Sequence, residues 1–260
     1  MTDYEAAILD VDGTIVRGDE LLPNVADGLS ALEGADVSRL LFSNNPTRAS
    51  GHYGEMLAPY GIDVDPEYVL TSATVSAAYL EETHPEETVY LVGSDRLEGI
   101  LEATAIELTD DPDAADVVVG SFDTDFSFGT LWESLRALED ETTSFYGTDP
   151  DTTIPIEDGE IPGSGALLAA MEAVAGREPD AILGKPSPIA ADAALERLES
   201  APERTLVVGD RLDTDIELGN RAGMTTVLVE TGVSDDGDLE SATTEPDYVL
   251  ESLAEIDAVL

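Results

Sequence analysis

The chain has 260 residues, with 57 acidic side chains against 11 lysines and arginines, and a formal net charge of -46 at pH 7. This charge argues against binding to nucleic acid or to anionic membranes. Because the acidic residues are spread along the whole chain, we interpret them as an adaptation to a salt-rich cytoplasm, where ions screen the repulsion. The absence of cysteine excludes disulfides and thiolate metal sites. The acidic N-terminal segment is followed by no long apolar stretch, so we expect no signal peptide, no membrane span and a cytoplasmic location.

Short apolar runs alternate with helical patterns along the chain. Each run is bounded by polar residues or glycine, which is typical of strands buried on both faces. Strand–helix alternation predicts an α/β fold with a doubly wound, Rossmann-like parallel sheet. The predicted strands are 6–9, 39–42, 181–183, 205–208, 226–229 and 248–250, and helical patterns cover 188–198 and 252–260.

The middle of the chain has strands and helices of its own, so it is too structured to be a loop. We therefore predict an inserted α/β domain over 84–179, within a core domain formed by 1–83 and 180–260. Trp132, the only tryptophan, is expected to serve packing. The insert's predicted strands are 89–93, 116–120 and 144–146, and its predicted helices are 130–138 and 164–174.

Polar clusters follow four of the predicted strands directly. In open α/β sheets, ligands bind outside the carboxyl ends of the strands. We therefore expect the four clusters to converge on one place. They are 10–12, 43–45, 184–185 and 209–210.

The first cluster reads Asp-Val-Asp-Gly-Thr over 10–14. A carboxylate such as Asp10, beside a divalent cation, can attack phosphorus and form an aspartyl-phosphate. Asp12 can protonate the leaving oxygen and later deprotonate water, and Gly13 permits the sharp turn that brings both acids to one pocket. The alternative is a strand end with solvated acids, which is common in so acidic a chain.

The second and third clusters offer groups that bind phosphate. Ser43, Asn44 and Asn45 supply a hydroxyl, amides and turn-exposed N–H groups that can cradle a phosphate, although an ordinary Asx turn has the same pattern. Lys185 is the only lysine of the chain. Its compact cation would neutralise the repulsion between Asp10 and an incoming phosphate dianion, and the alternative is an ordinary surface lysine.

The fourth cluster places Asp210 at a strand end, where a Mg²⁺ ligand is expected because Mg²⁺ prefers hard oxygen donors. Asp215 is predicted to be a second-shell anchor or a water-mediated ligand. Asp213 could have either role, and we leave it out of the site. With His52 and His84 as the only histidines, a serine triad or a histidine–zinc site is hard to build.

These four clusters, in this order, resemble the motifs of the haloacid dehalogenase superfamily of phosphohydrolases over essentially the whole chain. The large insert is similar to the type II cap of the NagD-like branch. The segments that look like this branch in detail are 43–46, 147–151, 162–166 and 184–188.

The resemblance implies Asp10 as nucleophile and Asp12 as general acid and base. It implies Mg²⁺ held by the Asp10 carboxylate, the Asp12 backbone carbonyl and Asp210. Ser43, Asn44 and Lys185 would bind the transferring phosphoryl group. Cap residues around Asp149 would reach the leaving group of the substrate, and an aspartate stands here where many relatives carry asparagine.

We therefore expect a Mg²⁺-dependent phosphatase of small phosphorylated metabolites, such as sugar phosphates, nucleoside monophosphates, phosphoglycolate or glycerol phosphate. One alternative is a dehalogenase or a phosphotransferase on the same scaffold. Another is a non-catalytic module that binds a phosphorylated ligand. Caps of this type often mediate dimers in similar proteins, so a homodimer is a further expectation.

Overall fold

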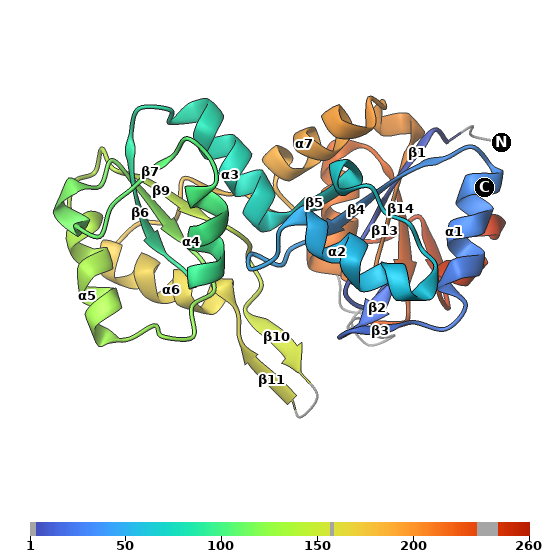
Figure 1. The fold of residues 1–260 in the computed structure, drawn as a ribbon, viewed down its shortest axis with the longest axis horizontal. Coiled ribbons are helices and arrows are strands. Elements are labelled where there is room, and N and C mark those ends of the chain that lie inside the picture. The colour runs from blue at the N-terminus through green and yellow to red at the C-terminus, as the bar shows by residue number, and fades with distance from the viewer. Residues whose placement is uncertain (1–3, 157–158, 233–243) are drawn as a thin grey trace. The chain divides into compact units, whose positions relative to one another are not determined.

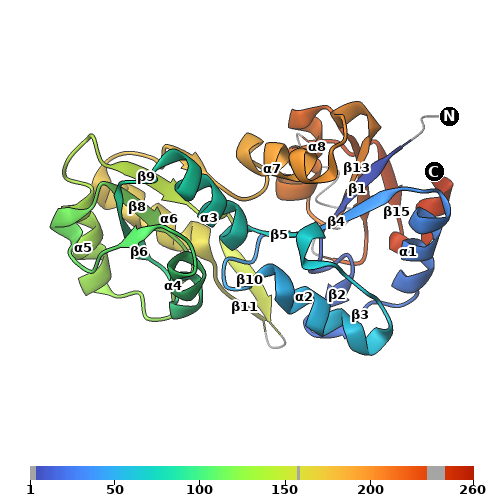
Figure 2. The same ribbon diagram turned by 45° about the horizontal axis from the view of Figure 1, so that its top comes forward.

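The computed structural model describes residues 4–156, 159–232 and 244–260. The chain divides into two compact units, of which the first comprises Met1–Ser43, Ser50–Leu70 and Ala190–Leu260. The second unit comprises Asn44–Ala49 and Thr71–Ile189. Each unit contains a parallel sheet with helices (Figures 1 and 2), so the predicted α/β class is confirmed.

The first unit is built on a sheet that has six strands among the described residues, in the order β15-β14-β13-β1-β4-β5. Strand β1 lies in the middle, parallel to β13 with Leu9 opposite Val208, and parallel to β4. All four residues of β1 are buried, as a central strand covered on both faces requires. The strands are β1 (Ala6–Leu9), β4 (Ser38–Ser43), β5 (Val69–Thr71), β13 (Thr205–Gly209), β14 (Thr225–Val229) and β15 (Tyr248–Leu250).

Helices cover both faces of this sheet. Helix α1 (Val25–Gly34) and the 3₁₀ helix η6 (Leu253–Ala258) share one apolar cluster with alternate residues of the central strands. On the other face lies α8 (Glu217–Ala222), whose Gly219 would carry a Cβ only 2.3 Å from Thr226 Cγ2. The remaining elements are β2 (Val16–Arg17), β3 (Glu20–Leu21), α2 (Ser50–Leu57), η1 (Ala58–Tyr60), η2 (Pro66–Tyr68), α7 (Pro188–Leu198), η4 (Pro202–Arg204) and the π-helical turn η5 (Leu212–Ile216).

The second unit has a sheet with five strands among the described residues, in the order β12-β9-β8-β6-β7. Helices α3 and α4 pack on one face of this sheet, and α5 and α6 pack on the other (Figure 1). Its elements are α3 (Ser72–Thr83), β6 (Thr88–Val92), α4 (Asp95–Glu102), β7 (Glu107–Leu108), η3 (Pro112–Ala114), β8 (Val117–Gly120), α5 (Phe128–Ala137), β9 (Ser144–Gly147), α6 (Ser164–Ala175) and β12 (Ala181–Ile182).

An antiparallel hairpin of β10 (Thr153–Ile156) and β11 (Gly159–Pro162) also belongs to the second unit and is not predicted by the sequence pattern. At its base the backbone is tightly packed, because a Cβ on Gly165 would lie 2.2 Å from the carbonyl oxygen of Pro150. Only glycine fits at that position.

Two predictions about these elements are wrong. The run 181–183 forms a strand, but β12 pairs with β9 of the second sheet, so Lys185 does not follow a strand of the first sheet. The local apolar pattern predicts a strand without specifying its partner. Trp132 is 60% exposed instead of packed. The helical pattern 252–260 is confirmed as a helix, the 3₁₀ helix η6.

The bounds of the second unit differ from the predicted insert. The second unit includes helix α3 and the chain up to Ile189, whereas the prediction places both in the core domain, over 1–83 and 180–260. The functional division into a catalytic core and a cap over 84–179 stays a prediction.

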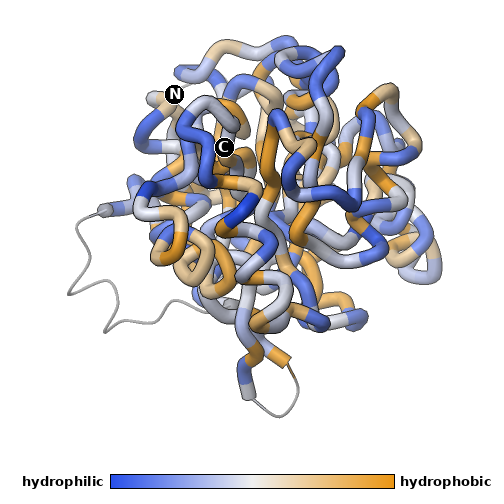
Figure 3. Tube along the Cα trace, turned by 90° about the vertical axis from the view of Figure 1, so that its left-hand side faces the viewer, coloured by the Kyte–Doolittle hydropathy of each residue, from blue (hydrophilic) through white to orange (hydrophobic). Residues whose placement is uncertain are grey.

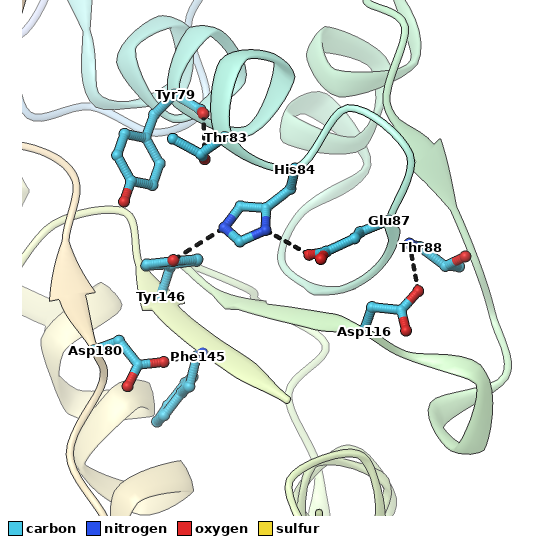
Figure 4. Close-up of polar contacts among 9 residues, drawn as sticks. All are labelled: Tyr79, Thr83, His84, Glu87, Thr88, Asp116, Phe145, Tyr146 and Asp180. Carbon is cyan, nitrogen blue, oxygen red and sulfur yellow. Dashed lines mark hydrogen bonds and ion pairs between the residues drawn. The ribbon is translucent and has the colours of Figure 1, made fainter. Parts of the chain in front are cut away.

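A polar cluster fixes the end of helix α3 in the second unit (Figure 4). Both ring nitrogens of His84 are engaged: Nδ1 lies 2.5 Å from Glu87 Oε2, and Nε2 lies 3.0 Å from the Tyr146 hydroxyl. Burial raises the pKa of Tyr146 to about 12, and a hydrogen bond with Tyr79 adds to this. Through these contacts His84 links the end of α3 to β9.

Hydrophilic residues recur along the outer loops and helices (Figure 3), as the composition requires. Within the ranges that the structure describes, no helix combines the length and apolar character needed to cross a bilayer.

Candidate active site

Three buried carboxylates form a cluster in the first unit. Asp10 follows β1, Asp210 follows β13, and Asp215 lies in the turn η5. One oxygen of each lies within 4.8 Å of the others, and the residues are only 8%, 0% and 1% exposed. Asp10 N–H donates to the Val208 carbonyl at 2.8 Å, which extends the pairing of β1 with β13 and brings these distant segments together.

Glycine backbone encloses these carboxylates closely. A Cβ on Gly13, whose φ is +92°, would lie 2.4 Å from Asp210 Oδ2, and one on Gly232 would lie 1.7 Å from the same oxygen. A Cβ on Gly209 would lie 2.2 Å from Asp215 Cγ. Any larger residue at these positions would displace a carboxylate, because a real Cβ does not approach other atoms so closely.

Asp12 is exposed, unlike the three clustered acids, and lies in the turn after β1. The Ser43 hydroxyl, which is buried, donates to Asp12 Oδ2 at 3.3 Å. The turn is fixed by Gly13 N–H, which donates to the Val16 carbonyl at 2.7 Å. The Gly13 carbonyl accepts a hydrogen bond from the Thr231 hydroxyl at 2.6 Å. The predicted pair of acids therefore stands with Asp10 buried and Asp12 accessible to solvent.

The loop after β13 separates its two later aspartates. Asp215 accepts a hydrogen bond from Arg211 N–H at 3.2 Å and is buried with Asp10 and Asp210. Asp213 is exposed and pairs with the Arg211 guanidinium, with its Oδ1 3.2 Å from Nε. The structure thus places Asp215 among the clustered carboxylates and Asp213 outside them.

Lys185 lies in the second unit and is 1% exposed, so the alternative of an ordinary surface lysine is wrong. The Asn44 side chain holds its backbone from both sides. Lys185 N–H donates to Asn44 Oδ1 at 2.9 Å, and Asn44 Nδ2 donates to the Lys185 carbonyl at 3.0 Å. The Ser72 hydroxyl in turn donates to the Asn44 carbonyl at 2.7 Å. Asn44 therefore positions the lysine loop.

Asn45 forms the Asx turn that the sequence left open as an alternative. Its Oδ1 accepts from Thr47 N–H at 2.9 Å and from the Thr47 hydroxyl at 2.8 Å. This turn fixes the start of the segment after Asn44.

Asp149 is 2% exposed in the second unit. Its Oδ2 accepts from the Thr148 hydroxyl at 2.9 Å and the Ser164 hydroxyl at 2.6 Å, and its Oδ1 accepts from Asp151 N–H at 3.3 Å. Burial, together with the charge of Asp151, raises the pKa of Asp149 to about 7. Its side chain is thus committed to contacts inside its own unit.

The cluster of Asp10, Asp210 and Asp215 fits a hard divalent cation. At separations near 4.8 Å each pair of ionised carboxylates repels by about 3–4 kcal/mol at an effective dielectric constant of about 20. A cation relieves this repulsion, and carboxylate oxygens are the donors that Mg²⁺ prefers. The absence of a Cβ on Gly13, Gly209 and Gly232 lets the backbone approach these carboxylates closely.

Sequence reasoning missed the contribution of Gly209 and Gly232. Gly209 could have been found from the sequence, because a glycine at the end of a predicted strand and beside an aspartate indicates close backbone packing. No local signal marks Gly232, because its neighbour Asp210 is distant in the chain.

The sequence is similar to proteins of one known family. The family model described as haloacid dehalogenase-like hydrolase matches residues 7–107, and a second, HAD-hydrolase-like model matches 182–256. An acid sugar phosphatase of Staphylococcus epidermidis is 33% identical over 253 residues, covering 97% of this chain and 96% of that protein. The chain belongs to the haloacid dehalogenase-like hydrolases. A dihydroxyacetone phosphatase of Corynebacterium glutamicum is also 33% identical, over 98% of this chain and 92% of that protein.

Solved structures of this family agree over the full length. A p-nitrophenyl phosphatase from Archaeoglobus fulgidus superposes with a TM-score of 0.92 at 31% identity, covering 99% of this chain and 100% of that one. NagD from E. coli K-12 superposes with a TM-score of 0.86 at 30% identity, covering 98% and 99%. The NagD-like assignment and the expectation of a phosphoric monoester hydrolase are confirmed, and a non-catalytic binding module is not supported.

Proposed function

We propose that this hydrolase is a Mg²⁺-dependent phosphatase of small phosphorylated metabolites that works through an aspartyl-phosphate on Asp10. The observation that carries the proposal is the cluster of three buried carboxylates at the ends of β1 and β13, in a chain whose full-length relatives are named phosphatases. Three carboxylates buried this close together are suited to binding a cation beside a phosphoryl group.

In the first step an Asp10 carboxylate oxygen attacks phosphorus, and the bond from phosphorus to the leaving oxygen breaks. Asp12 donates a proton to that oxygen, so the leaving group departs as an alcohol. The exposure of Asp12 suits this role, because substrate and then water can reach its carboxyl group, and the water of the second step restores its proton. The Ser43 hydroxyl that donates to Asp12 orients its carboxyl group.

In the second step a water molecule attacks the phosphorus of the aspartyl-phosphate while Asp12 takes its proton. The bond between phosphorus and the Asp10 oxygen breaks, inorganic phosphate forms, and the Asp10 carboxylate is restored. The two steps together consume one water and leave the protein unchanged.

In this proposal Asp10 and Asp210 hold Mg²⁺ through their carboxylates and Asp12 holds it through its backbone carbonyl. Asp215, buried beside them, anchors the set. When bound, Mg²⁺ neutralises the negative charge of the carboxylates and of the phosphoryl group.

Ser43, Asn44, Asn45 and Lys185 are proposed to bind the phosphoryl group. The Lys185 ammonium neutralises its charge, and Asn44 contributes by fixing the Lys185 backbone. The proposed cap, 84–179, supplies specificity. There Asp149 fixes the loop 147–151, whose residues would meet the leaving group.

The names of the relatives favour sugar phosphates and dihydroxyacetone phosphate as substrates, ahead of phosphoglycolate, glycerol phosphate and nucleoside monophosphates. The charge of -46 favours a cytoplasm rich in salt as the setting.

The test is a panel of these phosphate esters, with p-nitrophenyl phosphate as a general probe, in molar KCl with Mg²⁺ and with a chelator. We expect phosphate release in Mg²⁺ and its loss on chelation. Hydrolysis that persists at the same rate after chelation would contradict the metal requirement. Halide release from a haloacid in the chelated protein would instead support the dehalogenase alternative.

A further inference from the structure

Ser72 is a buried serine at the start of helix α3, and the steps proposed above give it no role. It is 0% exposed, and its hydroxyl donates to the Asn44 carbonyl at 2.7 Å. Asn44 directly follows β4 and Ser72 directly follows β5, and these two strands are neighbours in the first sheet. The strand order therefore brings Ser72 to the segment that is proposed to bind the phosphoryl group.

Asn44, the acceptor of this hydrogen bond, holds the lysine loop (184–187) with its side chain. Lys185 N–H donates to Asn44 Oδ1 at 2.9 Å, and Asn44 Nδ2 donates to the Lys185 carbonyl at 3.0 Å. These two bonds fix the two backbones relative to each other, but they do not fix either of them within the unit. The Ser72 hydroxyl supplies that anchor, because it belongs to a helix.

The start of α3 is itself held firmly. Thr71 and Thr74 form a capping box, in which Thr74 N–H donates to the Thr71 hydroxyl at 3.1 Å and Thr71 N–H donates to the Thr74 hydroxyl at 2.9 Å. The Thr71 hydroxyl also donates to the Arg48 carbonyl at 2.8 Å. The segment from Asn44 to Arg48 is thus tied at both ends to the start of α3.

The lysine loop has little space in which to move. A Cβ on Gly184 would lie 2.6 Å from the Thr148 carbonyl oxygen, 2.8 Å from Asn44 Oδ1 and 3.0 Å from Ser72 Cβ. Gly184 N–H also donates to the Thr148 carbonyl at 2.8 Å. Because packing here is so close, a shift of Asn44 is passed on to the lysine loop.

We propose, on the basis of the function proposed above, that Ser72 is a positioning residue for Lys185 and acts through Asn44. Lys185 is 1% exposed, so the place of its ammonium group follows from the place of its backbone. Without the Ser72 hydroxyl, the half-buried Asn44 carbonyl loses this donor, and Asn44 shifts toward another one. Electrostatic stabilisation of a phosphoryl group depends on a charge that is already in place, so such a shift weakens phosphate binding.

The experiment measures the binding of inorganic phosphate to the full chain by isothermal titration calorimetry, in molar KCl with Mg²⁺. We expect Ser72→Ala to bind phosphate about 10-fold more weakly than wild type. Ser76→Ala is the matched control. Ser76 lies one turn further along α3 and is also 0% exposed, but its hydroxyl has no hydrogen-bond partner within the part of the chain that the structure describes. This control should bind phosphate within about two-fold of wild type.

A double-variant cycle separates positioning of the lysine from a general loss of structure. Lys185→Met removes the ammonium group but keeps most of the side-chain volume. If Ser72 acts through Lys185, adding Ser72→Ala to Lys185→Met should weaken phosphate binding by less than about two-fold further. Losses that multiply fully in the double variant would overturn the proposal, as would equal phosphate binding by Ser72→Ala and Ser76→Ala.

A second substitution at the same position guards against a variant that does not fold. Ser72→Cys fills nearly the same space but offers only a weak donor, so it should also bind phosphate more weakly than wild type. Binding is measured without turnover, which separates the two proposals. A chain that shows this dependence on Ser72 but hydrolyses no ester would support the role of Ser72 and contradict the proposed function. Hydrolysis by wild type, together with unchanged phosphate binding in both Ser72 variants, would do the reverse.

Discussion

Both units bury carboxylates, and the two sites are built differently. In the first unit Asp10, Asp210 and Asp215 share one small volume enclosed by glycine backbone. In the second unit Asp149 is covered by hydroxyl donors, and burial beside Asp151 raises its pKa to about 7. The comparison teaches that repulsion between buried acids can be relieved by a cation in one place and by a proton in another.

The largest expected effect is on Asp10, the proposed nucleophile in the carboxylate cluster of the first unit. Asp10→Asn keeps the shape of the side chain but removes the attacking oxyanion, so we expect hydrolysis to fall by about 10,000-fold or more. Initial rates in Mg²⁺ and molar KCl measure this. Circular dichroism of the variant should match wild type, and a folded Asp10→Asn protein with rates near wild type would contradict the role of Asp10.

The next effect separates stability from activity in the same group. Asp210→Asn removes one charge from the cluster, so without metal we expect the variant to melt several degrees above wild type. Mg²⁺ should raise the melting temperature of wild type, because it binds the folded state, and should leave the variant almost unchanged. Equal Mg²⁺ stabilisation of both proteins would exclude Asp210 as a ligand.

The protonation of the buried Asp149 carboxyl group is tested by varying pH. Since the pKa of Asp149 is raised in the folded state, that state binds the proton more tightly than the unfolded chain does. Its contribution to stability is full below about pH 4 and is lost as pH rises to about 7. Asp149→Asn lacks this titration. The melting temperature of the variant relative to wild type should therefore rise by a few degrees between pH 5 and pH 8.

Thermal melts of both proteins in molar KCl give this comparison, because salt removes most of the background from surface charges. Parallel melting curves across pH 5–8 would show that the buried carboxyl group does not hold the proton.

The smallest effect comes from the acid that lies outside both groups. Asp213 shares a loop with Asp215, but it is exposed and pairs only at the surface with Arg211. We expect Asp213→Asn to change the free energy of unfolding by less than about 0.5 kcal/mol and to leave the Mg²⁺ dependence intact. Denaturant titration checks the first value, and loss of Mg²⁺ stabilisation in this variant would show that the cluster extends further.

The sequence alone predicts the parts that depend on local pattern. Strand β1 was predicted with its observed bounds, and the acids at the ends of β1 and β13 were predicted to meet because parallel strands share one carboxyl edge. The sheet that holds β12 was not predictable, since strand partners are set by tertiary packing. The exposure of Trp132 and the contact of Gly232 with Asp210 likewise depend on segments distant in the chain.

The central claim is that the phosphoryl group passes through Asp10, and the stereochemical course at phosphorus tests it most directly. A phosphomonoester made chiral with oxygen isotopes would be turned over with transfer of the phosphoryl group to an acceptor alcohol, so that the configuration can be read from the product. Two in-line displacements, first by Asp10 and then by the acceptor, predict retention of configuration. Inversion would show a single direct displacement and would contradict the aspartyl-phosphate.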